Sequence, residues 1–189
     1  MHDFDLKSLK TDIRPYNPAD CLALFKISTP NIFTWLPYGP FENELAMRTF
    51  YQKKSKDCEF FTVFDRDSKT IHGILAIKCI DTTHKKCEIG HIWYAEQYQR
   101  THVNTQAMFL VLCECFEKRE YRRVAWKCDN LNETSNYCAL RLGFKKEGVF
   151  RNDQIVKGKN KDTAWFSIID KEWHKVRKHL IRLIYDKYK

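Results

Sequence analysis

The stretch Cys87–Met108, "CEIGHIWYAEQYQRTHVNTQAM", decides the fold. The stretch begins within a predicted buried β-strand, Lys86–Tyr94, and ends within a long helix that apolar residues at helical spacing predict over Asn104–Tyr121. A polar loop joins the two and enters the helix near His102. The first amides of a helix lack intrahelical partners and the helix dipole adds positive charge, so an anion such as a pyrophosphate fits this place, although most helix starts bind only water.

The elements around this stretch complete one mixed α/β domain. Strands are expected at residues 11–16, 59–65, 71–81, 86–94, 122–129, 146–156 and 162–170, and helices at 17–28, 41–54, 104–121, 132–144 and 171–189. Antiparallel hairpins followed by a strand–helix–strand crossover predict a mixed, mostly antiparallel twisted sheet with helices on both faces. We expect a single domain over residues 1–173 and a basic amphipathic helix over 174–189 that packs on it or extends from it.

Composition narrows the class of partner and the compartment. The 189 residues include 33 Lys and Arg against 24 Asp and Glu, and the net charge of +9 favours an anionic partner: nucleic acid, an acidic membrane or a phosphorylated small molecule. The eight cysteines form no C-x-x-C pair, so we expect buried free thiols, no metal site and a reducing compartment. The N-terminus lacks the apolar segment of a signal peptide, and no apolar run reaches the roughly 20 residues of a membrane span. A soluble cytoplasmic protein is expected, and a nuclear location is also compatible.

Several ordered motifs resemble one enzyme family. They are "EIGHIW" (Glu88–Trp93), "QRTHVNTQA" (Gln99–Ala107), "NETSNYCALRLGF" (Asn132–Phe144), "EGVFR" (Glu147–Arg151) and "DTAWFSIIDKEW" (Asp162–Trp173). In this order they resemble the GNAT superfamily of acetyl-CoA-dependent N-acetyltransferases, and most closely the branch that includes ribosomal-protein N-terminal acetyltransferases of the RimJ/RimL type. The resemblance spans about residues 12–173. It implies the GNAT fold, acetyl-CoA as cosubstrate and an amine acceptor.

The resemblance also implies a coenzyme site. In that family a Q/R-x-x-G-x-G/A turn holds the pyrophosphate of coenzyme A, and here Gln99 takes the first place, His102 the first glycine and Asn104 the second. Asparagine is normal at that place in this branch, but histidine departs from the pattern. It keeps the backbone N–H and adds a bulky, titratable ring, so we expect a retained but reshaped site. The implied coenzyme-binding residues are Ile92, Trp93, Tyr94, Gln99, Arg100, Thr101, His102, Val103, Asn104, Thr105 and Asn132. Asn132 also suits a helix N-cap, and the strand residues would use main-chain groups beside a bulge.

Glu88 is the candidate general base that the resemblance implies, because it precedes Gln99 by the eleven residues at which several relatives carry a glutamate. The same glutamate could instead hold the strand by hydrogen bonds. His91 and Asp129 are the alternatives for the base.

Ser135 is the candidate acid for the leaving thiolate. Many relatives use a tyrosine at the position that Ala139 occupies here, and a serine in the "N-x-x-S" motif replaces it in the RimL-like branch. Ser135 could instead cap the helix, and Tyr137 is a third candidate for the acid.

The acceptor site is expected beside the loop 34–41, between the two early helices. Trp35, Tyr38 and Trp126 are its candidate lining residues, and ordinary hydrophobic packing is the alternative for each. The acceptor could be a protein N-terminus or a small-molecule amine. No nucleic-acid partner is expected, and a homodimer would fit the relatives. The alternative function is a coenzyme-binding or regulatory module without turnover, to which His102 and Ala139 point.

Overall fold

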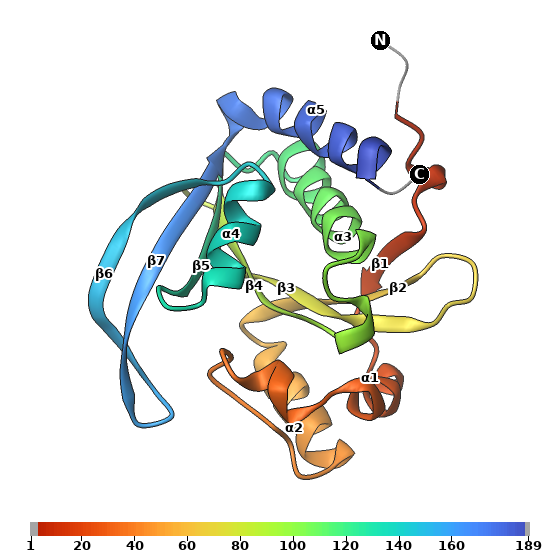
Figure 1. The fold of residues 1–189 in the computed structure, drawn as a ribbon, viewed down its shortest axis with the longest axis vertical. Helices are drawn as coiled ribbons and strands as arrows, with labels where there is room; N and C mark the ends of the chain where they lie inside the picture. The colour runs from red at the N-terminus through yellow and green to blue at the C-terminus, as the bar shows by residue number, and fades with distance from the viewer. Residues whose placement is uncertain (1–3, 188–189) are drawn as a thin grey trace.

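The computed structural model describes residues 4–187 and contains a seven-stranded sheet (Figure 1). Its strands are β1 (Thr11–Pro15), β2 (Cys58–Asp65), β3 (Ile71–Asp81), β4 (Lys86–Tyr94), β5 (Arg123–Asp129), β6 (Lys145–Val156) and β7 (Lys159–Ile169). The strand order is β1-β2-β3-β4-β5-β7-β6, in which only β4 and β5 are parallel. The predicted mixed, mostly antiparallel sheet is therefore confirmed. Residues 1–3 of the predicted domain (1–173) and residues 188–189 of the predicted C-terminal helix (174–189) lie outside the described residues.

Helices cover both faces of the sheet. They are α1 (Cys21–Ile27), α2 (Glu44–Lys54), α3 (His102–Cys113), α4 (Glu133–Arg141) and α5 (Asp170–Lys187). Figure 1 shows α3, α4 and α5 on one face, here called the α3 face, and α1 and α2 on the other, here called the α1 face. Each face has its own apolar core, because alternate residues of a strand point to opposite sides.

Strand β4 contains a bulge at His91. Ile74 of β3 pairs with Trp93, whereas Ala76 pairs with Gly90, so one residue of β3 lies opposite two residues of β4. His91 has a φ of 53°, in the left-handed region that few residues other than glycine adopt. An extra residue of this kind bends its strand and interrupts the ladder.

The bulge reverses the direction of the side chains that follow it. Cys87 and Ile89 lie in the core of the α3 face. Strict alternation would put Trp93 beside them, but Trp93 lies in the core of the α1 face, while Tyr94 lies in that of the α3 face.

Capping side chains set where the helices begin. The second helix was expected from Phe41, but α2 begins at Glu44 because the Asn43 side chain accepts a hydrogen bond from the N–H of Ala46. The long helix was expected from residue 104, but α3 begins two residues earlier behind the cap Thr101. It continues through a π-helical turn, Glu114–Lys118, rather than as a regular α-helix to residue 121.

The end of the chain joins both faces. The β6–β7 hairpin reaches the loop before α2, where the Lys157 ammonium donates to the carbonyl of Phe33 at 2.7 Å. Helix α5 follows β7 directly, and its Trp173 and Leu180 are buried in the core of the α3 face. The predicted boundary after residue 173 falls inside this helix.

All eight cysteines are free thiols. Most are buried, and the sulfurs of Cys87 and Cys115 are 3.8 Å apart. The expectation of a buried thiol is wrong for Cys79: this residue is exposed, because a register irregularity after Lys78 and a φ of 50° turn it outward. Within residues 4–187, no helix is long and apolar enough to cross a membrane.

A Gly73→Ala substitution should destabilise the fold. A Cβ at Gly73 would lie 2.1 Å from the carbonyl oxygen of Trp93 and 2.8 Å from the Cα of Tyr94, and neither backbone atom can move without disturbing the strand. We expect a loss of about 2–3 kcal/mol, seen as a fall in Tm of about 5–10 °C.

Gly148→Ala is the matched control, because a Cβ there meets no atom within 4 Å. Thermal unfolding followed by circular dichroism compares the two variants. Equal Tm values would show that the close approach of β3 to the end of β4 is not a constraint.

Candidate active site

Strands β4 and β5 separate where the bulge begins. Their parallel pairing stops at Ile89, opposite Trp126. Beyond that point, in the described sheet, Trp93 and Tyr94 pair only with β3 on their other side. The main-chain groups of β4 that face β5 are therefore available to an extended ligand, as the predicted pantetheine contacts of Ile92, Trp93 and Tyr94 require.

The polar side chains at the end of β4 are used within the protein. The indole N–H of Trp93 donates to the Tyr51 hydroxyl oxygen at 2.9 Å, and the Tyr94 hydroxyl donates to Oδ1 of Asn104 at 3.1 Å. Nε2 of Gln99 donates to the carbonyl of Tyr94 at 3.0 Å. These bonds hold the strand, the loop and the start of α3 in one arrangement.

The loop turns sharply into α3. Arg100 is exposed and has a φ of 61°. The Thr101 hydroxyl donates to the carbonyl of Tyr98 at 2.7 Å and accepts from the N–H of Val103 at 3.3 Å. Thr101 thus caps the helix and satisfies one of the four amides that a helix start leaves without intrahelical partners. The first turn of α3 contains no acidic residue, so its positive end is available to an anion.

The ring of His102 belongs to a cluster on the β2–β3 side of the turn. Burial and the nearby charge of Lys10 lower the pKa of His102, and Asp65 opposes this shift. The charge of His102 in turn contributes to lowering the pKa of His72. The ring centroids of His72 and Tyr98 lie 3.7 Å apart. The histidine that replaces the first glycine of the turn is therefore a packed side chain with partners of its own.

The first turn of α3 is also joined to α4. Nδ2 of Asn104 donates to the sulfur of Cys138 at 2.9 Å. The hydroxyl oxygen of Thr105, which is fully buried, accepts from Nη1 of Arg141 at 3.1 Å. The sequence predicted the first residue of each pair but not its partner in α4.

Helix α4 begins beside the end of β5. The Asn132 side chain accepts from the N–H of Ser135 at 3.0 Å, so the N-cap role of Asn132 is confirmed. The Ser135 hydroxyl oxygen accepts from the indole N–H of Trp126 at 3.1 Å. Trp126 lies in the core of the α3 face, so the structure does not bring it together with the other predicted acceptor residues. Tyr137 is exposed.

Glu88 lies on the α1 face and is only 4% exposed. Its Oε1 is 3.0 Å from the Lys78 ammonium of β3, and its Oε2 is 3.3 Å from the Lys127 ammonium of β5. A buried carboxylate needs such partners, and the three side chains join β3, β4 and β5 just before β4 and β5 separate. The Lys127 ammonium also lies 4.8 Å from the centroid of the Trp165 ring.

His91, at the bulge, faces an aromatic wall. Its ring lies 5.3 Å from the rings of Tyr38 and Phe60. Burial, with the charges of Lys78 and Lys54, lowers the pKa of His91 to about 4. The imidazole is therefore neutral near pH 7 and can accept a hydrogen bond.

Trp35 and Tyr38 lie on the same side of the sheet as His91. The Tyr38 ring is partly exposed while its hydroxyl is buried, and burial raises the pKa of this hydroxyl well above the usual value. The Trp35 ring is 43% exposed and lies 5.0 Å from the Lys161 ammonium, which pairs with Asp129. Aromatic rings and a carboxylate paired with Lys161 thus gather around this face.

Sequence reasoning missed the partners Lys78, Lys127 and Arg141. Each is a common surface residue in sequence, and only strand register or helix packing brings it to the site. Among residues 4–187, no group of three or more His, Cys, Asp or Glu side chains could hold a metal ion.

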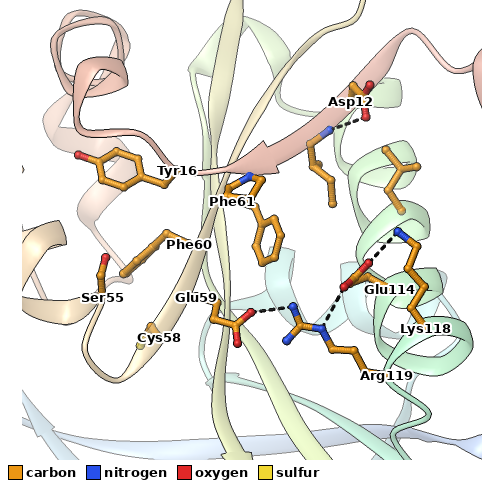
Figure 2. A pocket seen from close by; sticks show the side chains of 13 residues that line it. Asp12, Tyr16, Ser55, Cys58, Glu59, Phe60, Phe61, Glu114, Lys118 and Arg119 are labelled. Atoms are coloured by element: carbon orange, nitrogen blue, oxygen red, sulfur yellow. Dashed lines mark hydrogen bonds and ion pairs between the residues drawn. The ribbon is translucent and has the colours of Figure 1, made fainter.

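A separate cavity of about 560 Å³ lies at the β1–β2 edge (Figure 2). The charged residues in its lining are matched within the protein, since Arg119 bridges Glu59 and Glu114, and Asp12 pairs with Arg66. None of the predicted site residues lines it. This cavity is therefore distinct from the opening between β4 and β5.

Comparison with known proteins identifies related chains. Residues 11–145 match the family model described as "Acetyltransferase (GNAT) domain". The ribosomal-protein-serine acetyltransferase of Escherichia coli (strain K12) is 29% identical over 115 residues, which cover 60% of this chain and 63% of that protein. The matched residues span 55% to 63% of the length of three curated relatives, including this enzyme.

Solved structures share the fold. The crystal structure of a GCN5-related N-acetyltransferase from Brucella melitensis aligns with a TM-score of 0.85 and 35% identity, over 89% of this chain and 80% of that one. Spermidine N-acetyltransferase from Vibrio cholerae, solved in complex with CoA and spermine, aligns with a TM-score of 0.74 and 17% identity, over 87% of this chain and 98% of that one.

His91 should make the protein less stable at acid pH. The folded state holds the pKa of His91 at about 4, whereas an unfolded histidine titrates near about 6.5, so between these values the unfolded chain binds more protons. The free energy of unfolding therefore falls as pH decreases from about 6.5 to about 4. His91→Asn removes this titration and tolerates the positive φ.

Urea unfolding of both proteins at several pH values measures the effect. We expect the wild type to lose about 2 kcal/mol more than His91→Asn by pH 4.5, since His72 and His102 titrate in both proteins. Parallel losses would show that His91 titrates normally.

Proposed function

Because the chain belongs to the GNAT family of acetyltransferases, we propose that it transfers the acetyl group of acetyl-CoA directly to a primary amine in a ternary complex. The observation that carries the proposal is the opening between β4 and β5 after Ile89, next to the start of α3. Ser135 lies beside this opening from α4, and Glu88 and His91 belong to the α1 face.

Main-chain and loop groups would bind the coenzyme. The main chain of Ile92, Trp93 and Tyr94 would bond the pantetheine, and the Asn132 amide would contact it from α4. The pyrophosphate would lie against residues 99–105, where the amides of the first turn of α3 supply donors. A bound acetyl-CoA would supply the activated thioester, the acceptor would supply the amine, and the chain would supply the groups that bind, orient and move the proton.

The histidine in the turn is compatible with this binding. The ring of His102 is within electrostatic range of Lys10, Asp65 and His72, toward the β2–β3 hairpin. Its backbone N–H remains at the first position of α3, where an anion would be bound. This arrangement supports a retained coenzyme site over a disabled turn.

Ser135 would stabilise the leaving thiolate by donating a hydrogen bond to it. An indole N–H can only donate, so the bond from Trp126 occupies a lone pair of the Ser135 oxygen and leaves its hydroxyl proton to be donated elsewhere. Trp126 thereby acts as a positioning residue for Ser135. This positioning role takes the place of the role that the sequence predicted for Trp126, which was to line the acceptor site.

Glu88 would take the proton of the attacking amine, directly or through a water. The new N–C bond forms as the C–S bond breaks, the amine proton passes to the Glu88 carboxylate, and the leaving thiolate accepts a hydrogen bond from the Ser135 hydroxyl before it takes a proton from water. Lys78 and Lys127 hold the carboxylate in place. His91 and Asp129 remain the alternative bases, since both lie on the same face.

Trp35 and Tyr38 would line the acceptor site with His91. The names of two relatives supply the first acceptors to test: a peptide with an N-terminal serine, after the E. coli ribosomal-protein-serine enzyme, and spermidine, after the V. cholerae enzyme.

The proposal is tested by calorimetric titration with acetyl-CoA and by release of free CoA thiol in the presence of each acceptor. We expect micromolar binding and amine-dependent thiol release. Glu88→Gln should keep acetyl-CoA binding and lower kcat by about 100-fold, because a positioned base contributes at least that much.

Glu147→Gln is the control for loss of a carboxylate on the same sheet, since Glu147 pairs with Arg123 near the sheet's far edge. Binding of acetyl-CoA without transfer to any amine would support a coenzyme-binding module instead. A Glu88→Gln variant with full kcat and a lower Tm would assign Glu88 to holding the strands.

The Ser135–Trp126 pair should act as one unit in catalysis. Ser135→Ala should lower kcat by about 100-fold with little change in KM, as removal of a hydrogen bond made to developing charge does. Trp126→Phe should lower kcat about tenfold in the wild type and have no further effect on kcat in Ser135→Ala. Ser167→Ala, at a buried serine of β7, is the control. Additive losses would mean that Trp126 acts independently of Ser135.

A further inference from the structure

Arg141 lies beside the first turn of α3, against which the proposed function puts the pyrophosphate. It is the last residue of α4, and its Nη1 reaches across to the hydroxyl of Thr105 in the first turn of α3. Its own carbonyl accepts a bond from Nε2 of His179 in α5 at 2.8 Å. The backbone of Arg141 is therefore anchored while its guanidinium points to the start of another helix.

The electrostatic surroundings of this guanidinium are unusual for the protein. Among the described residues, the other half-buried arginines each form an ion pair with a carboxylate, namely Arg48, Arg66, Arg119, Arg123 and Arg177. Arg141 is half-buried, and in residues 4–187 its partners are the Thr105 hydroxyl and the Cys138 thiol. Placing a charge away from water without a counter-charge costs free energy.

The nearest large dipole makes the position still less favourable. A cation at the N-terminus of a helix is repelled by the positive end of the helix dipole, and α3 has no acidic residue in its first turn to compensate. An anion between the guanidinium and the helix start would satisfy both. A phosphate is the ligand that a planar guanidinium binds best, because two N–H groups can donate to two of its oxygens.

We propose that Arg141 binds the pyrophosphate of coenzyme A, an inference that rests on the proposed function. The turn has His102 and Asn104 where glycines would let the backbone approach the phosphates closely. A side chain from α4 compensates for that bulk by bringing a charge to the same place. The buried Thr105 hydroxyl orients the guanidinium. It would not contact the phosphate itself.

The test is the dissociation constant of three probes for wild type, Arg141→Gln and Arg141→Lys. CoA carries the pyrophosphate and the 3′-phosphate, dephospho-CoA carries only the pyrophosphate, and pantetheine carries neither. Arg141→Gln should weaken CoA and dephospho-CoA about 10- to 100-fold and leave pantetheine unchanged. Arg141→Lys should lose about tenfold, since an ammonium does not bind phosphate bidentately. Arg182→Gln, an exposed arginine of α5, controls for net charge and should stay within about twofold.

Each outcome has one meaning. If wild type binds CoA and both Arg141 variants bind it equally well, this inference is wrong while the proposed function stands. If wild type does not bind CoA, the proposed function fails. A loss with CoA but not with dephospho-CoA would overturn the pyrophosphate assignment in favour of the 3′-phosphate. A matching loss with pantetheine in Arg141→Gln would show that this substitution disturbs the fold of the site. Arg141→Lys, which keeps the charge and most of the volume, then decides: a loss of about tenfold with CoA and an unchanged dissociation constant for pantetheine support the inference, and unchanged binding of CoA overturns it.

Discussion

The bulge at His91 is the constraint on which the rest of the site depends. One extra residue in β4 ends its pairing with β5 at Ile89 and sends Trp93 to the α1 face. Without it, β4 would continue beside β5 as an ordinary parallel pair, and its main chain would be occupied by ladder hydrogen bonds. The opening, the direction of the side chains that end β4 and the position of the neutral imidazole all follow from this one irregularity.

Two groups of polar contacts hold the structure around the opening. Before it, Lys78 and Lys127 flank the Glu88 carboxylate and join three strands. Beyond it, Asn104 and Arg141 join the start of α3 to α4. In the proposed function, the same side chains that secure the scaffold would face the ligands. A structural role and a chemical role are compatible in such residues, since a group held in one position costs little to reorganise during a reaction.

Much of the fold could be predicted because its signals are local. The Asn132 cap and the strand Lys86–Tyr94 each depend on residues a few positions apart, and both appear in the structure. The errors arose where a local signal met a competing one. Asn43 capped α2 later than its apolar pattern begins, and an irregular strand turned Cys79 to solvent.

The sequence by itself determined the order of the elements, the loop that enters α3 and the surplus of positive charge, because side-chain periodicity and composition are properties of the chain. Only the tertiary structure decided which distant residues meet. Arg141 reaches Thr105 across 36 positions, and Trp126 reaches Ser135 from another element. The physical reason is that strand register and helix packing are set by the whole core, so one bulge can exchange the faces of a strand without any change in its residues.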